Sequence, residues 1–183
     1  MNFSFDASKA SQVAGWFLQQ QGGRMNIMKL IKLAYLLDRL SLERRGLPVL
    51  GGDYFSMKNG PVISEVLDLI NAGRLDGMET DWEQFIADRQ NHEVEIRQPP
   101  GTGQLSEAEQ MLMAETQARF GQMDAFQLVK WCHDNCPEWH PLSRGRREIQ
   151  VEDILSAVGK TPGQIQRIVQ REAEFRQLAE LLN

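Results

Sequence analysis

The sequence predicts a mainly α-helical fold, a single-domain helical bundle that carries a small antiparallel element of two β-strands. Over residues 27–44, apolar residues occur on most sides of a helix, which is typical of a helix inside a bundle. Much of the remaining chain also has apolar residues at helical spacing, bounded by capping residues and glycine. Only residues 53–58 and 92–97 alternate as short strands do. We expect these two strands to pair with each other, because an isolated strand leaves its backbone groups unpaired.

Two helices are expected in the amino-terminal part of the chain. Asp6 can cap a helix over residues 7–21, because a side-chain oxygen at that position accepts a hydrogen bond from a free amide. Asn26 can cap the helix over residues 27–44 in the same way, and Gly46 supplies its C-terminal stop. The second helix is therefore the expected scaffold of the fold.

The next elements meet at a Gly-Pro pair. In the strand over residues 53–58, Phe55 and Met57 lie on one side, which fits a strand with one buried face. Gly60 ends the strand. Pro61 suits the first position of a third helix, where the missing N–H is not needed.

The carboxy-terminal half is expected to be helical. Ser106 and Glu109 form a capping box pattern. Helices are expected over residues 82–87, 106–120, 125–135, 149–158 and 162–182. The last helix is expected to turn its apolar side chains inward, namely Ile165, Ile168, Val169, Phe175, Leu178 and Leu182. We interpret residues 1–183 as one domain, with a core over residues 7–160 and the C-terminal helix 162–182.

Charge and hydropathy exclude several partner classes. The net charge is −5, whereas a sequence-independent nucleic-acid binder needs a basic face, so nucleic acid is not an expected partner. The longest apolar stretch contains Lys29, Lys32 and Asp38, so we expect no membrane span and no membrane partner. The first residues lack the pattern of a signal peptide, and we expect a cytoplasmic protein.

One cluster of potential metal ligands is present. Cys132, Cys136 and His140 are spaced four apart, so a helix would bring them to one face, with His133 nearby. Pro137 should interrupt that helix and separate the ligands. We therefore favour buried thiols and hydrogen-bonded histidines without a metal. A metal-dependent enzyme or sensor using this cluster stays as an alternative.

No motif for catalysis is found elsewhere. Nucleophile elbows, phosphate-binding loops and zinc-protease motifs are absent from the sequence, so we expect no enzyme, no catalytic residue and no cofactor. Basic residues cluster at Arg144, Arg146 and Arg147, and more weakly at Arg44-Arg45. The first cluster could contact phosphates or an acidic partner, but a solvated loop is the favoured interpretation.

Several motifs, taken in order, resemble a known family. These are Lys29-Leu30-x-Lys32-Leu33-x-Tyr35, then Phe55-Ser56-Met57-Lys58-Asn59-Gly60-Pro61-Val62, and finally Leu128-x-x-Trp131-Cys132-His133 with Trp139. This pattern is similar to that of the Panacea domain family, the SocA-like and GepA-like antitoxin proteins that are often phage-associated. At Asn59 the family usually has an aromatic residue, so this chain departs from the pattern there.

The resemblance implies a binding protein. Panacea domains act as antitoxins of toxin–antitoxin pairs, so the expected function is neutralisation of a cognate protein toxin, encoded by a neighbouring gene, through direct contact. The SocA branch implies an alternative, a proteolytic adaptor that delivers its toxin to an ATP-dependent protease. The partner-binding residues expected on this basis are Tyr54, Lys58, Asn59, Gly60 and Pro61. Family-motif residues with an expected structural role are Lys29, Lys32, Tyr35, His133 and Trp139, with His133 hydrogen-bonded in the core and Trp139 covering its end.

Overall fold

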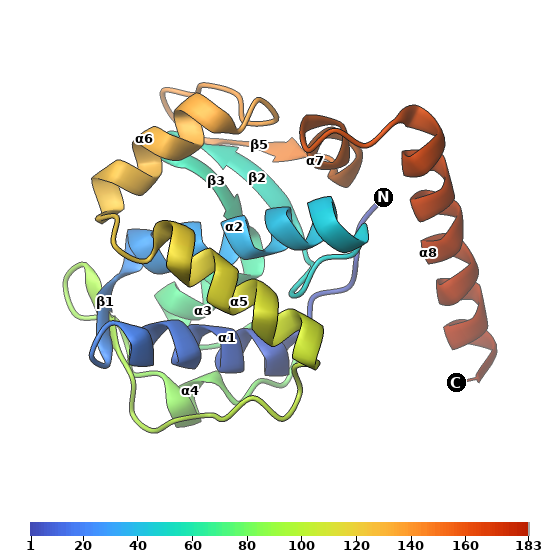
Figure 1. Ribbon diagram of the computed structural model, residues 1–183. Coiled ribbons are helices and arrows are strands. Elements are labelled where there is room, and N and C mark those ends of the chain that lie inside the picture. The colour runs from blue at the N-terminus through green and yellow to red at the C-terminus, as the bar shows by residue number, and fades with distance from the viewer. Residues whose placement is uncertain (183) are drawn as a thin grey trace.

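The computed structural model describes residues 1–182, which form eight helices and five short strands (Figure 1). The helices are α1 (Ala7–Gln20), α2 (Ile27–Arg45), α3 (Ser64–Ala72), α4 (Trp82–Phe85), α5 (Glu107–Phe120), α6 (Ala125–Asn135), α7 (Val151–Ala157) and α8 (Pro162–Leu182). The strands are β1 (Arg24–Asn26), β2 (Tyr54–Met57), β3 (Gly60–Ile63), β4 (Glu93–Glu95) and β5 (Arg146–Ile149). The fold is mainly α with small antiparallel sheets, so the predicted fold class is confirmed.

Helix α2 is the centre of the molecule. It contacts α1, α3, α5, α6, α7 and strand β3, and Figure 1 shows it running between α5 and the sheet. Leu33, Tyr35 and Leu37 on this helix have no exposed surface. The interior position predicted from its all-round apolar pattern is confirmed. The structure adds that polar side chains on α2, among them Lys32 and Asp38, are also fully buried.

The caps expected from sequence are present. Asp6 accepts a hydrogen bond from the Lys9 amide at 2.9 Å, and Asn26 accepts one from the Met28 amide at 2.8 Å. Ser106 opens α5 with a complete capping box. The sequence identified these helix starts correctly because each cap joins a side chain to a backbone amide only a few residues away.

The expected pairing of the two strands is wrong. Strand β2 pairs with β3 and β5 in a three-stranded antiparallel sheet of order β3-β2-β5, whereas β4 pairs with β1. Burial does not alternate along β3 or β5: all four residues of β3 are buried, and only the last residue of β5 is buried. Each expected strand has its backbone groups satisfied by a neighbour that the sequence did not identify.

The prediction for Pro61 is also corrected. Pro61 lies inside β3, opposite Ser56, and α3 begins only at Ser64. Because β3 is an edge strand of its sheet, the missing N–H of proline can face away from the ladder. Ile149, expected to start a helix, instead ends β5 and pairs with Tyr54.

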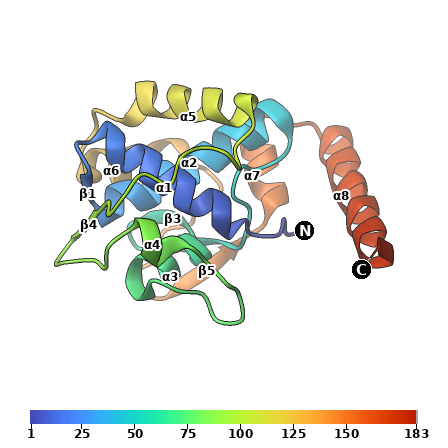
Figure 2. The same cartoon turned by 90° about the horizontal axis from the view of Figure 1, so that it is seen from below.

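Helix α8 stands at one side of the molecule, and both views show it beside the end of α2 (Figures 1 and 2). The helix contains no buried residue, so the expected inward orientation of its whole apolar set is wrong. Ile165 and Ile168 in its first turns pack partly against the core, whereas Phe175, Leu178 and Leu182 are exposed. Within residues 1–182, no helix has the length and apolarity required to cross a membrane.

Candidate functional site

Strands β2 and β3 form a tight hairpin whose turn, Lys58 and Asn59, is exposed to solvent. Met57 pairs with Gly60 at the end of the ladder. Gly60 has φ of 102°, a left-handed conformation that strains any residue with a Cβ atom. A Cβ atom at Gly60 would lie 3.1 Å from Nζ of Lys32, so the glycine also permits close approach of that lysine.

Lys32, on α2, stabilises this hairpin from the interior of the protein. Its side chain has no exposed surface, and its Nζ donates a hydrogen bond to the carbonyl oxygen of Pro61 at 2.8 Å. Burial lowers the pKa of Lys32 to about 8, because the charged form loses its hydration. A buried ammonium therefore holds the backbone of the Gly60-Pro61 segment in place.

Trp139 fixes the other side of the hairpin. Its indole Nε1 donates to the carbonyl oxygen of Met57 at 2.8 Å, and the backbone amide of His140 donates to Oγ of Ser56 at 3.0 Å. His133 stacks on Trp139, with ring centroids 3.9 Å apart and the ring planes 6° from parallel. The segment after α6 thus holds the hairpin by two hydrogen bonds and a stacked pair of rings.

His133 lies at the surface, which corrects the expectation of a core histidine. Partial burial is the main cause that lowers its pKa, and the positive charge of Lys32 acts in the same direction, whereas a hydrogen bond with the Lys58 backbone opposes the shift. The stacked pair of His133 and Trp139 therefore borders the exposed hairpin turn. The sequence predicted a core position for His133 because the local pattern does not show that α6 ends against the hairpin.

A small apolar pocket of about 120 Å³ lies next to the turn. Met28 and Ile31 of α2, Met57 of β2 and Leu67 of α3 line it together with the exposed turn residues. Methionine side chains adapt their shape to a ligand more readily than branched side chains do. Because this lining comes from separate elements, no sequence motif could have revealed it.

We call this surface the hairpin face. It consists of Lys58, Asn59, His133 and Trp139 together with the adjoining apolar pocket. Charge, aromatic rings and an apolar depression occur there within one region, which is a combination typical of protein interfaces.

Tyr54 does not belong to this surface, which corrects its expected role in partner contact. It is buried, and its hydroxyl donates to Oδ2 of Asp38 at 2.7 Å. Asp38 also accepts backbone N–H bonds from Val49, Leu50 and Gly51 at 2.8, 2.8 and 3.0 Å. Burial raises the pKa of Asp38 to about 6, against the opposing effect of these hydrogen bonds. Tyr54 therefore helps to position the loop before β2.

Gly60 and Pro61 are buried as well, so of the five expected contact residues only Lys58 and Asn59 are exposed. Gly60 and Pro61 affect the surface only indirectly, because they fix the backbone conformation of the turn. Substitutions at Lys58 and Asn59 consequently test contact, whereas substitutions at Gly60 test the support of the turn.

The other motif residues on α2 connect this helix to distant segments. Lys29 donates to the carbonyl oxygen of Gly121 at 2.7 Å. The Tyr35 hydroxyl donates to Oε1 of Glu138 at 2.6 Å, and Nε of Arg39 donates to the same oxygen at 2.7 Å. These contacts connect α2 to the ends of α5 and α6, and α6 leads to the residues that hold the hairpin.

The cysteine and histidine cluster is dispersed in the structure. Cys132 and Cys136 are buried and hydrogen-bonded to each other, while His133 stacks on Trp139 at the surface. This thiol pair, together with nearby Lys32, lowers the pKa of Cys132. Among residues 1–182, no group of three His, Cys, Asp or Glu side chains could hold a metal ion.

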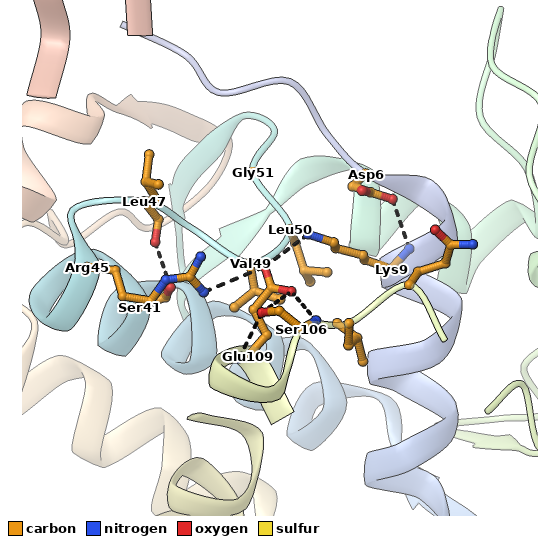
Figure 3. Close-up of polar contacts among 12 residues, drawn as sticks. Asp6, Lys9, Ser41, Arg45, Leu47, Val49, Leu50, Gly51, Ser106 and Glu109 are labelled. Carbon is orange, nitrogen blue, oxygen red and sulfur yellow. Dashed lines mark hydrogen bonds and ion pairs between the residues drawn. The ribbon is translucent and has the colours of Figure 1, made fainter. Parts of the chain in front are cut away.

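A second concave region of about 360 Å³ lies between the amino-terminal segment and α8. Figure 3 shows the polar contacts beneath it, where Arg45 and Ser106 both approach Glu109. Lys9 and Arg45 lie 2.9 and 3.6 Å from Oε1 of Glu109. Burial would raise the pKa of Glu109, but the hydrogen bonds from Lys9 and Ser106 outweigh it and lower the pKa. These charges are paired with one another, so we prefer the hairpin face as the candidate site.

Comparison with known proteins gives one match. A family model described as "Antitoxin SocA-like, Panacea domain" matches residues 30–140, which is more than half of the chain. The matched region includes most of α2, the whole β2–β3 hairpin, α6 and Trp139. No curated protein and no solved structure matches the chain.

Proposed function

This chain belongs to the SocA-like antitoxin family with a Panacea domain, and from this membership we propose that it neutralises a cognate protein toxin by binding it directly. The observation that carries the proposal is the family match over residues 30–140. Neutralisation by contact needs no catalytic residue, and we assign none. We place the encounter in the cytoplasm and propose that a neighbouring gene encodes the toxin.

We propose the hairpin face as the surface that contacts the toxin. Lys58 and Asn59 would meet the partner directly, and the pocket beside Met57 would receive an apolar side chain. The stacked rings of His133 and Trp139 would extend the contact beyond the turn. A stable complex of this kind buries about 1,600 Å² in total, so the contact would also reach residues around the hairpin face.

Co-expression tests the proposal. The product of the adjacent reading frame should arrest growth when expressed alone, and growth should recover when this protein is also expressed. If that product is harmless, or if its toxicity persists beside this protein, the proposed pairing is wrong. Purified components should then form a complex that can be isolated by size-exclusion chromatography.

Charge reversal at Lys58 tests whether the hairpin face contacts the toxin. We expect Lys58→Glu to weaken toxin binding about tenfold, because an exposed cation in an interface is replaced by an anion. Arg74→Glu is the matched control, since Arg74 is also exposed but lies in the turn after α3. Equal toxin affinity of both variants would contradict a role for the hairpin turn. Melting temperatures of both variants should match the parent, which separates binding from folding.

The proteolytic adaptor is the alternative mechanism, and it predicts a different fate for the partner. An adaptor shortens the half-life of the toxin, whereas sequestration leaves the half-life unchanged or lengthens it. A pulse-chase measurement of toxin half-life, with and without this protein, therefore distinguishes the two. We favour sequestration, because it requires only the one interface described above.

A further inference from the structure

A basic groove lies on the side of the molecule where α2 ends against α8. Its volume is about 410 Å³, and the lining residues contain five cations and no acidic residue. The cations are Arg44 and Arg45 at the end of α2 and Lys160, Arg167 and Arg171 on or before α8; Gly46, Gln164 and Ile168 complete the lining. Such a concentration of positive charge is unexpected in a chain of net charge −5.

The cations of α2 and α8 differ in their pairing. Arg44 lies 2.9 Å from Glu115 and Arg45 lies 3.6 Å from Glu109, so both arginines of α2 have acidic neighbours outside the groove. In the described part of the chain, Lys160, Arg167 and Arg171 form no ion pair. Arg167 and Arg171 are also exposed. Three positive charges of this groove therefore remain uncompensated.

Helix α8 forms one side of this groove and is held against the end of α2. Residues 164, 167 and 171 are spaced by three and four, so they occupy one face of α8, and Lys160 precedes the helix by two residues. Both views show the end of α2 beside α8 (Figures 1 and 2). A Cβ atom at Gly46 would lie 2.7 Å from Cδ1 of Ile168, so glycine permits this close approach. Packing therefore holds two sets of like charges opposite each other.

Like charges held in this way repel, and an anionic ligand between them would relieve the repulsion. A single strand of nucleic acid would be expected to stack its bases on aromatic rings, but no aromatic side chain lines the groove. The planar guanidinium groups of arginine match the geometry of carboxylates, and the Gln164 amide can pair with a peptide backbone. The lining therefore favours an acidic peptide.

We propose that the basic groove binds an acidic segment of a protein partner. Arg167 and Arg171 hold carboxylates of that segment from α8, and Arg44 and Arg45 face it from α2. This site is separate from the hairpin face. The inference goes beyond the proposed function, because it holds whether or not the partner is a toxin.

Binding of a fluorescein-labelled oligoglutamate peptide to the full chain tests the proposal. We expect measurable binding at low salt that weakens as ionic strength rises, because the charges become screened. Replacing both arginines, Arg167→Gln with Arg171→Gln, should weaken binding on the order of tenfold. Arg176→Gln is the matched control on the same helix, since Arg176 pairs with Glu172 and does not line the groove. Its affinity for the peptide should equal that of the parent.

Three results would overturn the proposal. The first is an absence of peptide binding at low salt, or an equal affinity of the double variant and the parent. The second is tighter binding of a labelled oligothymidylate that the double variant loses, which would make the groove a nucleic-acid site. The third is a dimer of the unliganded chain that the double variant abolishes, which would assign the groove to a second copy. Circular dichroism of the double variant should match the parent, since both replaced side chains are exposed.

Discussion

Replacing Lys32 with methionine should make the protein more stable at neutral pH and a poorer antitoxin. Methionine has a similar length, so it fills the same space without the charge. The ammonium group has no exposed surface, and its one hydrogen bond in the described structure goes to the carbonyl oxygen of Pro61 at 2.8 Å. A buried charge without an opposite charge in contact destabilises the folded state.

The size of this stability difference follows from the pKa of Lys32. Burial lowers the pKa of Lys32 from 10.5 to about 8, which corresponds to about 3 kcal/mol because each pKa unit is worth ~1.4 kcal/mol. Removing the lysine also leaves the carbonyl oxygen of Pro61 without its donor, which costs about 1–3 kcal/mol. The variant should therefore be more stable than the parent by roughly 1 kcal/mol at pH 7.

The difference between parent and variant should reverse as the pH rises. Between pH 8 and 10.5 the unfolded chain keeps the proton on Lys32 while the folded chain releases it, so the unfolded state binds more protons. The stability of the parent relative to Lys32→Met must then increase with pH, by up to about 3 kcal/mol across that window. At pH 10.5 the parent should be the more stable of the two proteins.

Urea unfolding followed by tryptophan fluorescence, under reducing conditions, measures this difference from pH 7 to 10.5. Leu33→Met is the control, because Leu33 is a fully buried neighbour on α2 that carries no charge. Its stability difference from the parent should not change with pH. If the difference between the parent and Lys32→Met is also independent of pH, the buried-charge interpretation is refuted. Loss of toxin rescue by a Lys32→Met protein that is more stable would show that Lys32 acts through the hairpin and not through stability.

Further predictions concern the turn, the helix contacts and α8. Gly60→Val should destabilise the protein by about 2–4 kcal/mol in urea unfolding, because valine is strained at φ of 102° and its Cβ would lie 3.1 Å from Nζ of Lys32; unchanged stability would contradict this. Tyr35→Phe removes a 2.6 Å hydrogen bond to buried Glu138 and should lower the unfolding free energy by about 1–3 kcal/mol, while an effect below ~0.5 kcal/mol would show that water replaces the hydroxyl. Leu178→Gln should change stability by no more than ~0.5 kcal/mol, since Leu178 is 59% exposed; a larger loss would show that this face of α8 is covered in solution.

Agreement between sequence and structure is greatest where the deciding contacts are local. The cap formed by Asp6 and the capping box of Ser106 and Glu109 involve residues three apart, so their spacing in the chain is enough to identify them. The interior position of α2 followed from its apolar residues, which occur on most sides of the helix, because such a helix has to be surrounded by other elements.

Predictions failed where the deciding contact joins distant segments. Pro61 looked like a helix start, but its place in β3 depends on pairing with β2. On its other side β2 pairs with the distant strand β5, where Tyr54 lies opposite Ile149, 95 residues later in the chain. His133 looked like a core residue, but it is exposed. It stacks on Trp139, and the indole of Trp139 donates a hydrogen bond to the carbonyl oxygen of Met57, so the end of α6 lies against the hairpin. Neither pairing leaves a signal in the local pattern.

The sequence by itself determined the mainly helical fold, the central helix and the family motif around Lys58 and Pro61. These follow from hydrophobic periodicity, capping chemistry and short-range spacing, all of which are properties of consecutive residues. Only the tertiary structure decided which motif residues reach the surface and which support it. Burial of Lys32 and Tyr54 and exposure of His133 depend on how α2, the β2–β3 hairpin and α6 pack together, and burial is a property of that packing and not of any one segment.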